Sequence, residues 1–203
     1  MTQTNVYSVN GDVAQKVDVP AVFSTPYRPD IIKKAVLAAA ANGRQPYGPA
    51  KKAGMRHAVS TRGKGTGSAR NQRVHGLGKA SESPNNVSFP VVVSDAAQDL
   101  TTTAEVSAFL EKIGLGYDLD RAKDGRKIRA GRGTMRNRKY RTPVSVLIVV
   151  AEREVPIFKS AANLPGVQIE AVGNLSASIL APGGDAGRLV VYTESAFAKI
   201  GEW

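Results

Sequence analysis

Short apolar runs recur along this sequence and predict the strands of a sheet. Four of them have the length and composition of buried strands and lie at residues 89–93, 144–150, 167–172 and 189–192. The run at 144–150 is rich in β-branched residues, which predicts a strand covered on both faces. Residues 6–9 and 16–19 favour a short hairpin, and residues 115–120 predict a further strand.

Helical spacing of apolar residues occupies most of the intervals between these runs. Pro29 stands where a first helix begins, and Asn42 followed by Gly43 ends it. The apolar face of this helix is expected to carry Ile32, Ala35, Val36 and Ala39. Further helices are predicted at residues 157–163, near residues 175–180 and from Glu194 onward.

A capping box predicts one more helix. Thr102 to Glu105 has the spacing at which the two end residues cap each other's backbone N–H groups. Gly114 and Gly116 are interpreted as its end. Its inward face is expected to hold Ala108, Phe109 and Ile113.

The alternation of strands and helices indicates right-handed βαβ units. The apolar periodicity disappears between residues 44 and 86, a stretch too polar to bury the surface that would offset its chain entropy. We therefore predict a single α/β domain with a mainly parallel sheet of about four strands flanked by helices, plus a long extended basic arm. The domain comprises residues 1–43 and 87–203, with a basic loop at 121–143, and the arm comprises residues 44–86.

Charge is divided unevenly along the chain, which has 28 Lys and Arg, 17 Asp and Glu and a net charge of +11. Residues 44–79 hold nine basic residues and no acidic one, and residues 121–141 hold ten basic residues against Asp124 alone. Each segment carries +9, so the rest of the chain carries −7. A mildly acidic domain with two basic segments favours a polyanionic partner, most commonly nucleic acid.

The first basic segment is rich in glycine. Gly63, Gly65 and Gly67 alternate with polar residues and leave the backbone free to approach a phosphate chain. They do not form a P-loop, and the third glycine of a dinucleotide motif is replaced by Ser68 or Arg70. A nucleic-acid backbone therefore fits this segment better than a bound nucleotide. RNA contacts are expected from Arg44, Lys51, Lys52, Arg56, Arg62, Lys64, Arg70 and Arg73.

The second basic segment is rich in arginine. Arginine suits bidentate phosphate contact and stacking on bases, and a tyrosine among the cations offers a further stacking face. The alternative is an exposed linker between two strands. RNA contacts are expected from Arg126, Lys127, Arg129, Arg132, Arg136, Arg138, Lys139, Tyr140 and Arg141.

Enzymatic and metal-binding patterns are weak in this sequence. There is no cysteine, and His57 and His75 lack the spacing of a helical zinc site. Asp118 and Asp120 would share one face of a strand, but no third ligand is evident. The serines lack the Gly-x-Ser-x-Gly context of a nucleophile elbow. We expect no enzyme activity, no metal, no cofactor and no small-molecule substrate.

The amino-terminal residues and the cysteine count bear on location. The polar residues 1–5 do not resemble a signal peptide, and the longest strongly apolar run, 144–151, is far too short to span a bilayer. The lack of cysteine fits a reducing compartment. We expect a cytoplasmic protein that is not bound to a membrane and is not a homo-oligomer in its working state.

Four motifs, spread in order over nearly the whole chain, carry a family resemblance. They are PDIIKKAV at 29–36, RGKGTGSAR at 62–70, RNRKYR at 136–141, and LAPGG at 180–184 with GRL at 187–189. Together they resemble the large-subunit ribosomal protein L-four family, in its archaeal and eukaryotic branch.

The resemblance implies an α/β domain on the outside of the large subunit, with an extension reaching through ribosomal RNA to the peptide exit tunnel. There the tip meets ribosomal protein L-twenty-two across a constriction. The implied role is structural and in assembly, without catalysis. The resemblance places Arg62, Lys64, Arg70 and Arg73 at the root of the extension, and Arg136, Arg138, Lys139 and Arg141 in a second RNA contact.

The chain departs from the family before the strand at 89–93. Only residues 74–88 lie there, whereas the family usually has a much longer stretch that includes the tunnel tip and a helix. Either the chain is a short variant or residues are missing near 74–79. The sequence GLGK at 76–79 resembles an abrupt join, which favours the second interpretation.

A DNA-binding or nucleoid-type protein is the alternative function. No predicted helix combines a basic face with the context of a recognition helix, and both basic segments are glycine-rich. RNA of complex shape suits such segments better. The expected partners are large-subunit ribosomal RNA and neighbouring large-subunit ribosomal proteins.

Overall fold

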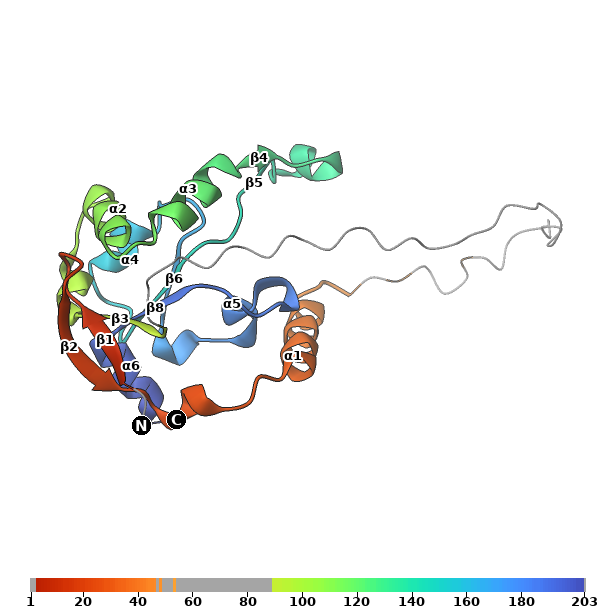
Figure 1. Ribbon diagram of the computed structural model, residues 1–203. Helices are drawn as coiled ribbons and strands as arrows, with labels where there is room; N and C mark the ends of the chain where they lie inside the picture. Colours follow the sequence, from red (N-terminus) through yellow and green to blue (C-terminus); the bar gives the residue numbers. More distant parts are fainter. Residues whose placement is uncertain (1–2, 47, 49–52, 54–88, 203) are drawn as a thin grey trace.

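The computed structural model describes residues 3–46, 48, 53 and 89–202, and its centre is a mainly parallel six-stranded sheet (Figure 1). The strand order is β2-β1-β3-β8-β6-β7, and β2 alone in this sheet is antiparallel to its neighbour. The strands are β1 (Gln3–Tyr7), β2 (Val13–Asp18), β3 (Val91–Val93), β6 (Leu147–Val150), β7 (Gln168–Ala171) and β8 (Val190–Thr193).

All four predicted apolar runs form strands of this sheet, and the predicted hairpin is also present. The hairpin adds β1 and β2, so the sheet has six strands where about four were predicted. It joins the sheet because β1 pairs in parallel with β3, where Val6 faces Val92. Both of these side chains are fully buried, so the hairpin belongs to the core.

The sheet is covered on both faces. One face packs against α2 (Thr103–Lys112), α3 (Gly116–Asp124) and α4 (Ile157–Ala161), and the other against α6 (Glu194–Gly201) (Figure 1). On that second face, Phe23 of the 3-10 helix η1 (Ala21–Ser24) contacts the rings of Tyr192 and Phe197. All four residues of β6 are buried, as predicted for a strand covered on both faces. On the α6 side, burial raises the pKa of Tyr192 to about 12.

Helix α2 has the predicted capping box. The Thr102 side chain accepts a hydrogen bond from the Glu105 backbone N–H, and the Glu105 carboxylate accepts one from the Thr102 N–H. The expectation for Ala108 was wrong, because this residue is exposed. The buried stripe has the spacing i, i+3, i+4, i+7, which leaves Ala108 outside it, and consists of Val106, Phe109, Leu110 and Ile113.

Residues 115–120 do not form the predicted strand. They cap and begin helix α3, with Leu115 as the N-cap residue. Gly114, at φ +93°, ends the preceding helix, whereas Gly116 starts the new one. Leu115, Leu119 and Ala122 are buried at the spacing i, i+4, i+7. This spacing is typical of a helix, and it extends beyond the short run from which a strand was predicted.

Helix α1 (Pro29–Asn42) begins and ends where predicted, but it is less buried than expected. Val36 is buried and Ile32 partly so, whereas Ala35 and Ala39 are exposed. The helix lies away from the sheet, against the short α5 (Ala177–Leu180) and the 3-10 turn after it (Figure 1). So small a partner covers only a narrow stripe of a helix.

The remaining predicted helices are present as α4, α5 and α6. Within the described part of the chain, the helices are too short or too polar to cross a membrane.

Candidate nucleic-acid interface

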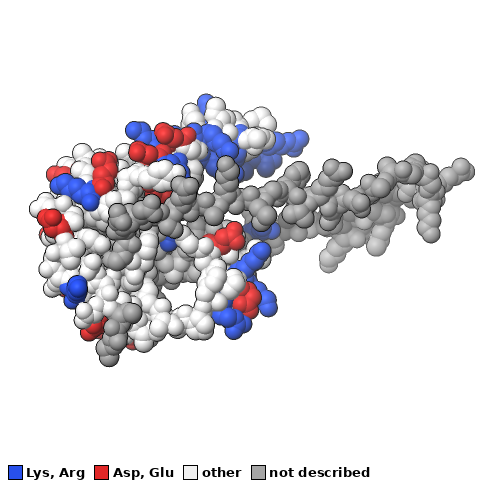
Figure 2. Space-filling model, in the orientation of Figure 1, with Lys and Arg blue, Asp and Glu red and all other residues white. Residues whose placement is uncertain are grey.

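The second basic segment is a folded projection, which we call the basic ribbon (residues 125–143). It consists of β4 (Lys127–Ile128), the 3-10 helix η3 (Gly131–Arg136) and β5 (Tyr140–Arg141), and it extends from the end of α3 (Figure 1). The sequence predicted only a loop here. Figure 2 shows Lys and Arg side chains gathered over this projection. The ribbon contains eight Lys and Arg residues and no Asp or Glu.

Backbone hydrogen bonds hold the ribbon together in place of a hydrophobic core. The Arg129 N–H donates to the Lys139 carbonyl at 2.8 Å, and the Arg138 N–H donates to the Gly133 carbonyl at 3.0 Å. The Thr134 hydroxyl donates to the Arg129 carbonyl at 2.6 Å. The cations are therefore carried by a backbone that is already ordered. Binding through them costs less conformational entropy than binding through a disordered linker would.

The two strands of the ribbon give it two chemically different faces. Lys127 pairs with Arg141 across the strands, and Ile128 pairs with Tyr140. Cross-strand partners share a face and successive residues alternate, so one face presents two cations and the other an aliphatic and an aromatic side chain. The Arg126 guanidinium carbon lies 4.4 Å from the Tyr140 ring centroid, a cation–π contact within the ribbon.

The predicted RNA-binding residues fall into three groups. Those of the ribbon come together on one projection, and every one of them is exposed. Arg44 is also exposed and lies just after α1. The other predicted contacts of the first segment lie outside the described residues, and they are Lys51, Lys52, Arg56, Arg62, Lys64, Arg70 and Arg73.

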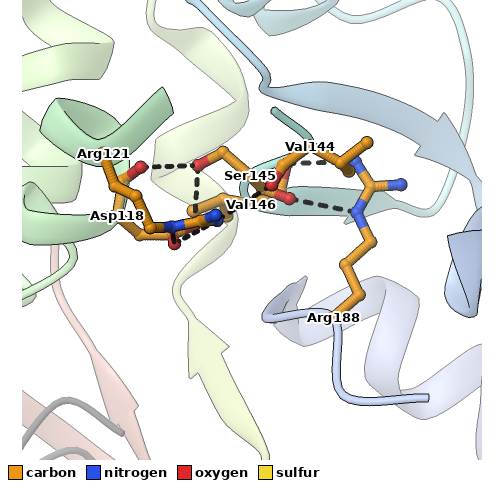
Figure 3. A network of polar contacts seen from close by, with 6 residues as sticks. All are labelled: Asp118, Arg121, Val144, Ser145, Val146 and Arg188. Atoms are coloured by element: carbon orange, nitrogen blue, oxygen red, sulfur yellow. Dashed lines mark hydrogen bonds and ion pairs between the residues drawn. The ribbon is translucent and has the colours of Figure 1, made fainter. Parts of the chain in front are cut away.

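The base of the ribbon, which we call its neck, is formed by residues 121–125, which enter the ribbon, and residues 143–145, which leave it. A polar network fixes this neck to the sheet (Figure 3). Arg121 donates through Nε and Nη2 to the Asp118 carboxylate, at 2.8 and 2.7 Å, and also through Nη2 to the Val144 carbonyl at 2.9 Å. The buried Ser145 hydroxyl donates to the second oxygen of Asp118 at 2.7 Å. One carboxylate thus ties the helix that enters the ribbon to the chain that leaves it.

Arg188 extends this network into the sheet. Its Nε donates to the Ser145 carbonyl at 3.1 Å, and its Nη1 donates to the Gln168 side chain and the Ile179 carbonyl, both at 2.8 Å. Burial lowers the pKa of the Arg188 guanidinium, while the charge of Asp118 opposes that shift. The side chain links the start of β6, strand β7 and α5.

The neck is also closely packed. A Cβ atom at Gly125 would lie 2.5 Å from the Pro143 ring and 2.8 Å from the Arg121 carbonyl oxygen. Glycine is therefore required where the ribbon begins, because the two chains of the neck approach too closely for a side chain.

Sequence reasoning missed these anchoring residues. The sequence placed Asp118 at the end of a strand without enough ligands for a cation, and it gave Ser145 no role because the context of a nucleophile elbow is absent, whereas the two residues bind each other. In the described residues no three His, Cys, Asp or Glu side chains are grouped to hold a metal. The available signal was Arg188, which lies in the GRL motif of the family resemblance.

Removing the Asp118 carboxylate is expected to lower the free energy of unfolding by about 1 to 3 kcal/mol, because Asp118→Ala leaves the buried Ser145 hydroxyl without its closest acceptor. Asp120→Ala is the matched control. It removes the same charge from an exposed position of the same helix and should change stability by no more than about 0.5 kcal/mol. Urea denaturation measures both, and equal losses would show that the network does not anchor the neck.

Comparison of the sequence with known proteins identifies the family of this chain. The model of the ribosomal protein L4/L1 family matches residues 17–88 and 80–203. The large ribosomal subunit protein uL4 of Haloquadratum walsbyi is 36% identical over 249 positions, covering 98% of this chain and 99% of the relative. The uL4 proteins of Methanocaldococcus jannaschii (36%, covering 97% of each chain) and Thermoplasma volcanium (35%, covering 99% and 98%) are similar along their length too.

The alignment with the Haloquadratum walsbyi protein is longer than the chain. It spans 249 positions against 203 residues, so at least 46 of its positions have no residue here. The two matches to the family model overlap at residues 80–88, directly after the sequence GLGK at 76–79.

The match to the family model covers nearly the whole chain, and several relatives exceed 30% identity over their full length. The chain therefore belongs to the ribosomal protein L4/L1 family, whose members are structural rather than enzymatic components.

Proposed function

We propose that this protein is a structural constituent of the large ribosomal subunit in the cytoplasm, and that it binds large-subunit ribosomal RNA through its two basic segments. The observation that carries the proposal is the basic ribbon, a folded projection with eight cations and no acid. Ordinary solvated projections mix charges of both signs. Family membership supports the ribosomal setting, because the relatives are named as proteins of the large subunit.

The two faces of the ribbon have separate roles in this proposal. Lys127 and Arg141 meet the RNA backbone, where they neutralise phosphates and release counterions. Tyr140 and Ile128 lie on the opposite face and meet exposed bases or sugars, which single-stranded RNA presents in loops and bulges. The anchored neck fixes the direction in which the ribbon enters the RNA.

The first basic segment, residues 44–86, is proposed as a second RNA-binding arm. Its nine cations without an acid, from Arg44 to Lys79, support this role. The family resemblance directs the arm through ribosomal RNA toward the peptide exit tunnel. The matches to the family model meet inside residues 80–88 and the alignment leaves at least 46 positions empty, which supports the interpretation that residues are missing near 74–79.

Contacts of this kind support ribosome assembly, because one protein bound to several RNA segments holds them together. The proposed partners are ribosomal RNA and neighbouring proteins of the large subunit, with one copy of this chain in each assembly.

Preference for folded RNA over duplex DNA tests the proposal. Titrations with large-subunit ribosomal RNA and with duplex DNA, at matched salt, should give clearly tighter binding to the RNA, because the exposed bases that Tyr140 would contact are absent from a duplex. Equal affinity for both would favour the alternative, a DNA-binding or nucleoid-type protein.

A further inference from the structure

A cavity of about 560 Å³ opens beside the neck of the basic ribbon. It lies at the edge of the sheet where three parallel strands begin. Its walls come from the residues that precede β3, β6 and β8, from α3, from Phe23 of η1 and from Tyr192 of β8. The volume falls within the roughly 300 to 1,000 Å³ typical of pockets that hold small ligands.

Large apolar side chains around this cavity remain in contact with solvent. Tyr117 is 67% exposed, Phe89 57% and Val144 45%. Two aromatic rings and an aliphatic side chain around one hollow form a surface suited to a flat, apolar partner.

The charged groups of the cavity balance one another. Its lining includes two cations, Arg121 and Arg188, and two carboxylates, Asp118 and Asp185. A free phosphate would gain little from a lining with no net charge. A neutral ring with polar edges fits better, since the aromatic side chains can stack on its faces while carboxylate and guanidinium groups bond its edges.

The Nη1 group of the Arg121 guanidinium remains available to a ligand at this site. Its Nε and Nη2 bind Asp118 and Val144, while the described residues supply no acceptor for its Nη1. The side chain is therefore held rigidly by one part of its guanidinium group and can donate to a ligand through the other.

The cavity is continuous with the basic ribbon. Arg121 and Val144 line it, and the same two residues stand on either side of the ribbon's neck, joined by a hydrogen bond (Figure 3). RNA held along the ribbon would therefore pass the mouth of the cavity. A base that turns out of the RNA stack loses its stacking on neighbouring bases. A pocket with aromatic walls replaces that loss with stacking on protein side chains.

We propose that this cavity binds one unpaired nucleobase of the RNA held by the ribbon, stacked against Tyr117 and Phe89 and hydrogen-bonded at its edge by Arg121. The inference rests on the proposed function and adds to it a site for a single base. The lining is amphipathic and neutral, so this contact contributes stacking to the affinity and adds little to its salt dependence.

Tyr117→Ala is the central variant of the test. It should weaken binding to large-subunit ribosomal RNA about 5- to 150-fold, the range that corresponds to loss of one stacked base, while the slope of affinity against salt stays unchanged. Tyr117→Phe keeps the ring and should restore most of the affinity. Tyr27→Ala removes an equally exposed tyrosine outside the cavity lining and should have no effect.

Chemical probing of the base edges locates the contact. With the wild-type protein, one unpaired base should be protected from dimethyl sulfate or a carbodiimide reagent, and Tyr117→Ala should restore its reactivity. Thermal melts of the free variants check that the fold is intact, which the exposure of Tyr117 predicts.

Each outcome distinguishes this inference from the proposed function. If charge removal from the ribbon lowers the salt slope but Tyr117→Ala binds RNA like the wild type, the cavity does not hold a base and the ribbon still binds RNA. If Tyr117→Ala binds RNA normally yet joins the large subunit poorly, the occupant is a neighbouring protein, which also overturns the inference. If RNA binding changes neither on removal of the ribbon's cations nor in Tyr117→Ala, the proposed function itself fails.

Discussion

Replacing Ile148 by alanine is expected to lower the free energy of unfolding by about 2 to 5 kcal/mol. Ile148 is only 1% exposed and lies in the middle of β6, with Val191 of β8 on one side and Ile169 of β7 on the other. Its side chain belongs to the cluster that joins the sheet to α2, α3 and α4. The truncation removes apolar contacts and leaves a cavity among neighbours that can relax only partly.

Chemical denaturation of the wild type and the variant measures this loss. Val144→Ala supplies the control, since Val144 precedes the same strand but is 45% exposed, and its truncation should cost no more than about 0.5 kcal/mol. A typical domain is stable by roughly 5 to 15 kcal/mol, so the expected effect of Ile148→Ala is large on that scale. Equal effects of the two substitutions would show that β6 is not the centre of the core.

The sheet could be predicted because its strands are buried on both faces. Such strands are continuous apolar runs, and the runs that became β3, β6, β7 and β8 stand out against polar surroundings. Residues 115–120 were predicted wrongly because a six-residue window containing Leu115 and Leu119 fits either period. The decisive residue was Ala122, which completes the helical stripe three positions after Leu119.

The burial of α1 was overestimated for a different reason. Apolar periodicity shows which face of a helix could be buried but not how large a partner it meets. Here the partner is the short α5 with the turn that follows it, and only Val36 of the expected face is fully covered. Tertiary contacts of this kind are absent from a local pattern.

The chemistry of the candidate site was easier to predict than its architecture. Local composition was enough to identify the basic residues from Arg126 to Arg141. The anchoring of the ribbon was not predictable, because it joins Asp118, Ser145 and Arg188, which are far apart in sequence. Arg188 lies in the GRL motif of the family resemblance, but nothing in the sequence pairs it with Asp118 or Ser145, and only the fold brings the three residues together.

Removing three cations from the ribbon is expected to change the salt dependence of RNA binding. If Arg136, Arg138 and Arg141 each neutralise a phosphate, the triple alanine variant should reduce the slope of log affinity against log salt by about 0.7 to 0.9 for each lost contact. The effect of the substitutions on RNA affinity should therefore be greatest at low salt. Titrations with large-subunit ribosomal RNA at several salt concentrations measure the slope.

A charge-matched control separates phosphate contact from general attraction. Lys16, Lys112 and Arg153 are exposed and lie outside the ribbon, so changing all three to alanine removes the same net charge and should leave the slope nearly as steep as in the wild type. Neither triple variant should change the melting temperature by much, because the removed side chains are exposed and the Arg138 backbone keeps its bond to Gly133. An unchanged slope in the ribbon variant would mean that the ribbon is a linker between α3 and β6. A fall of equal size in both variants would mean that net charge, and not the ribbon, draws this protein to RNA.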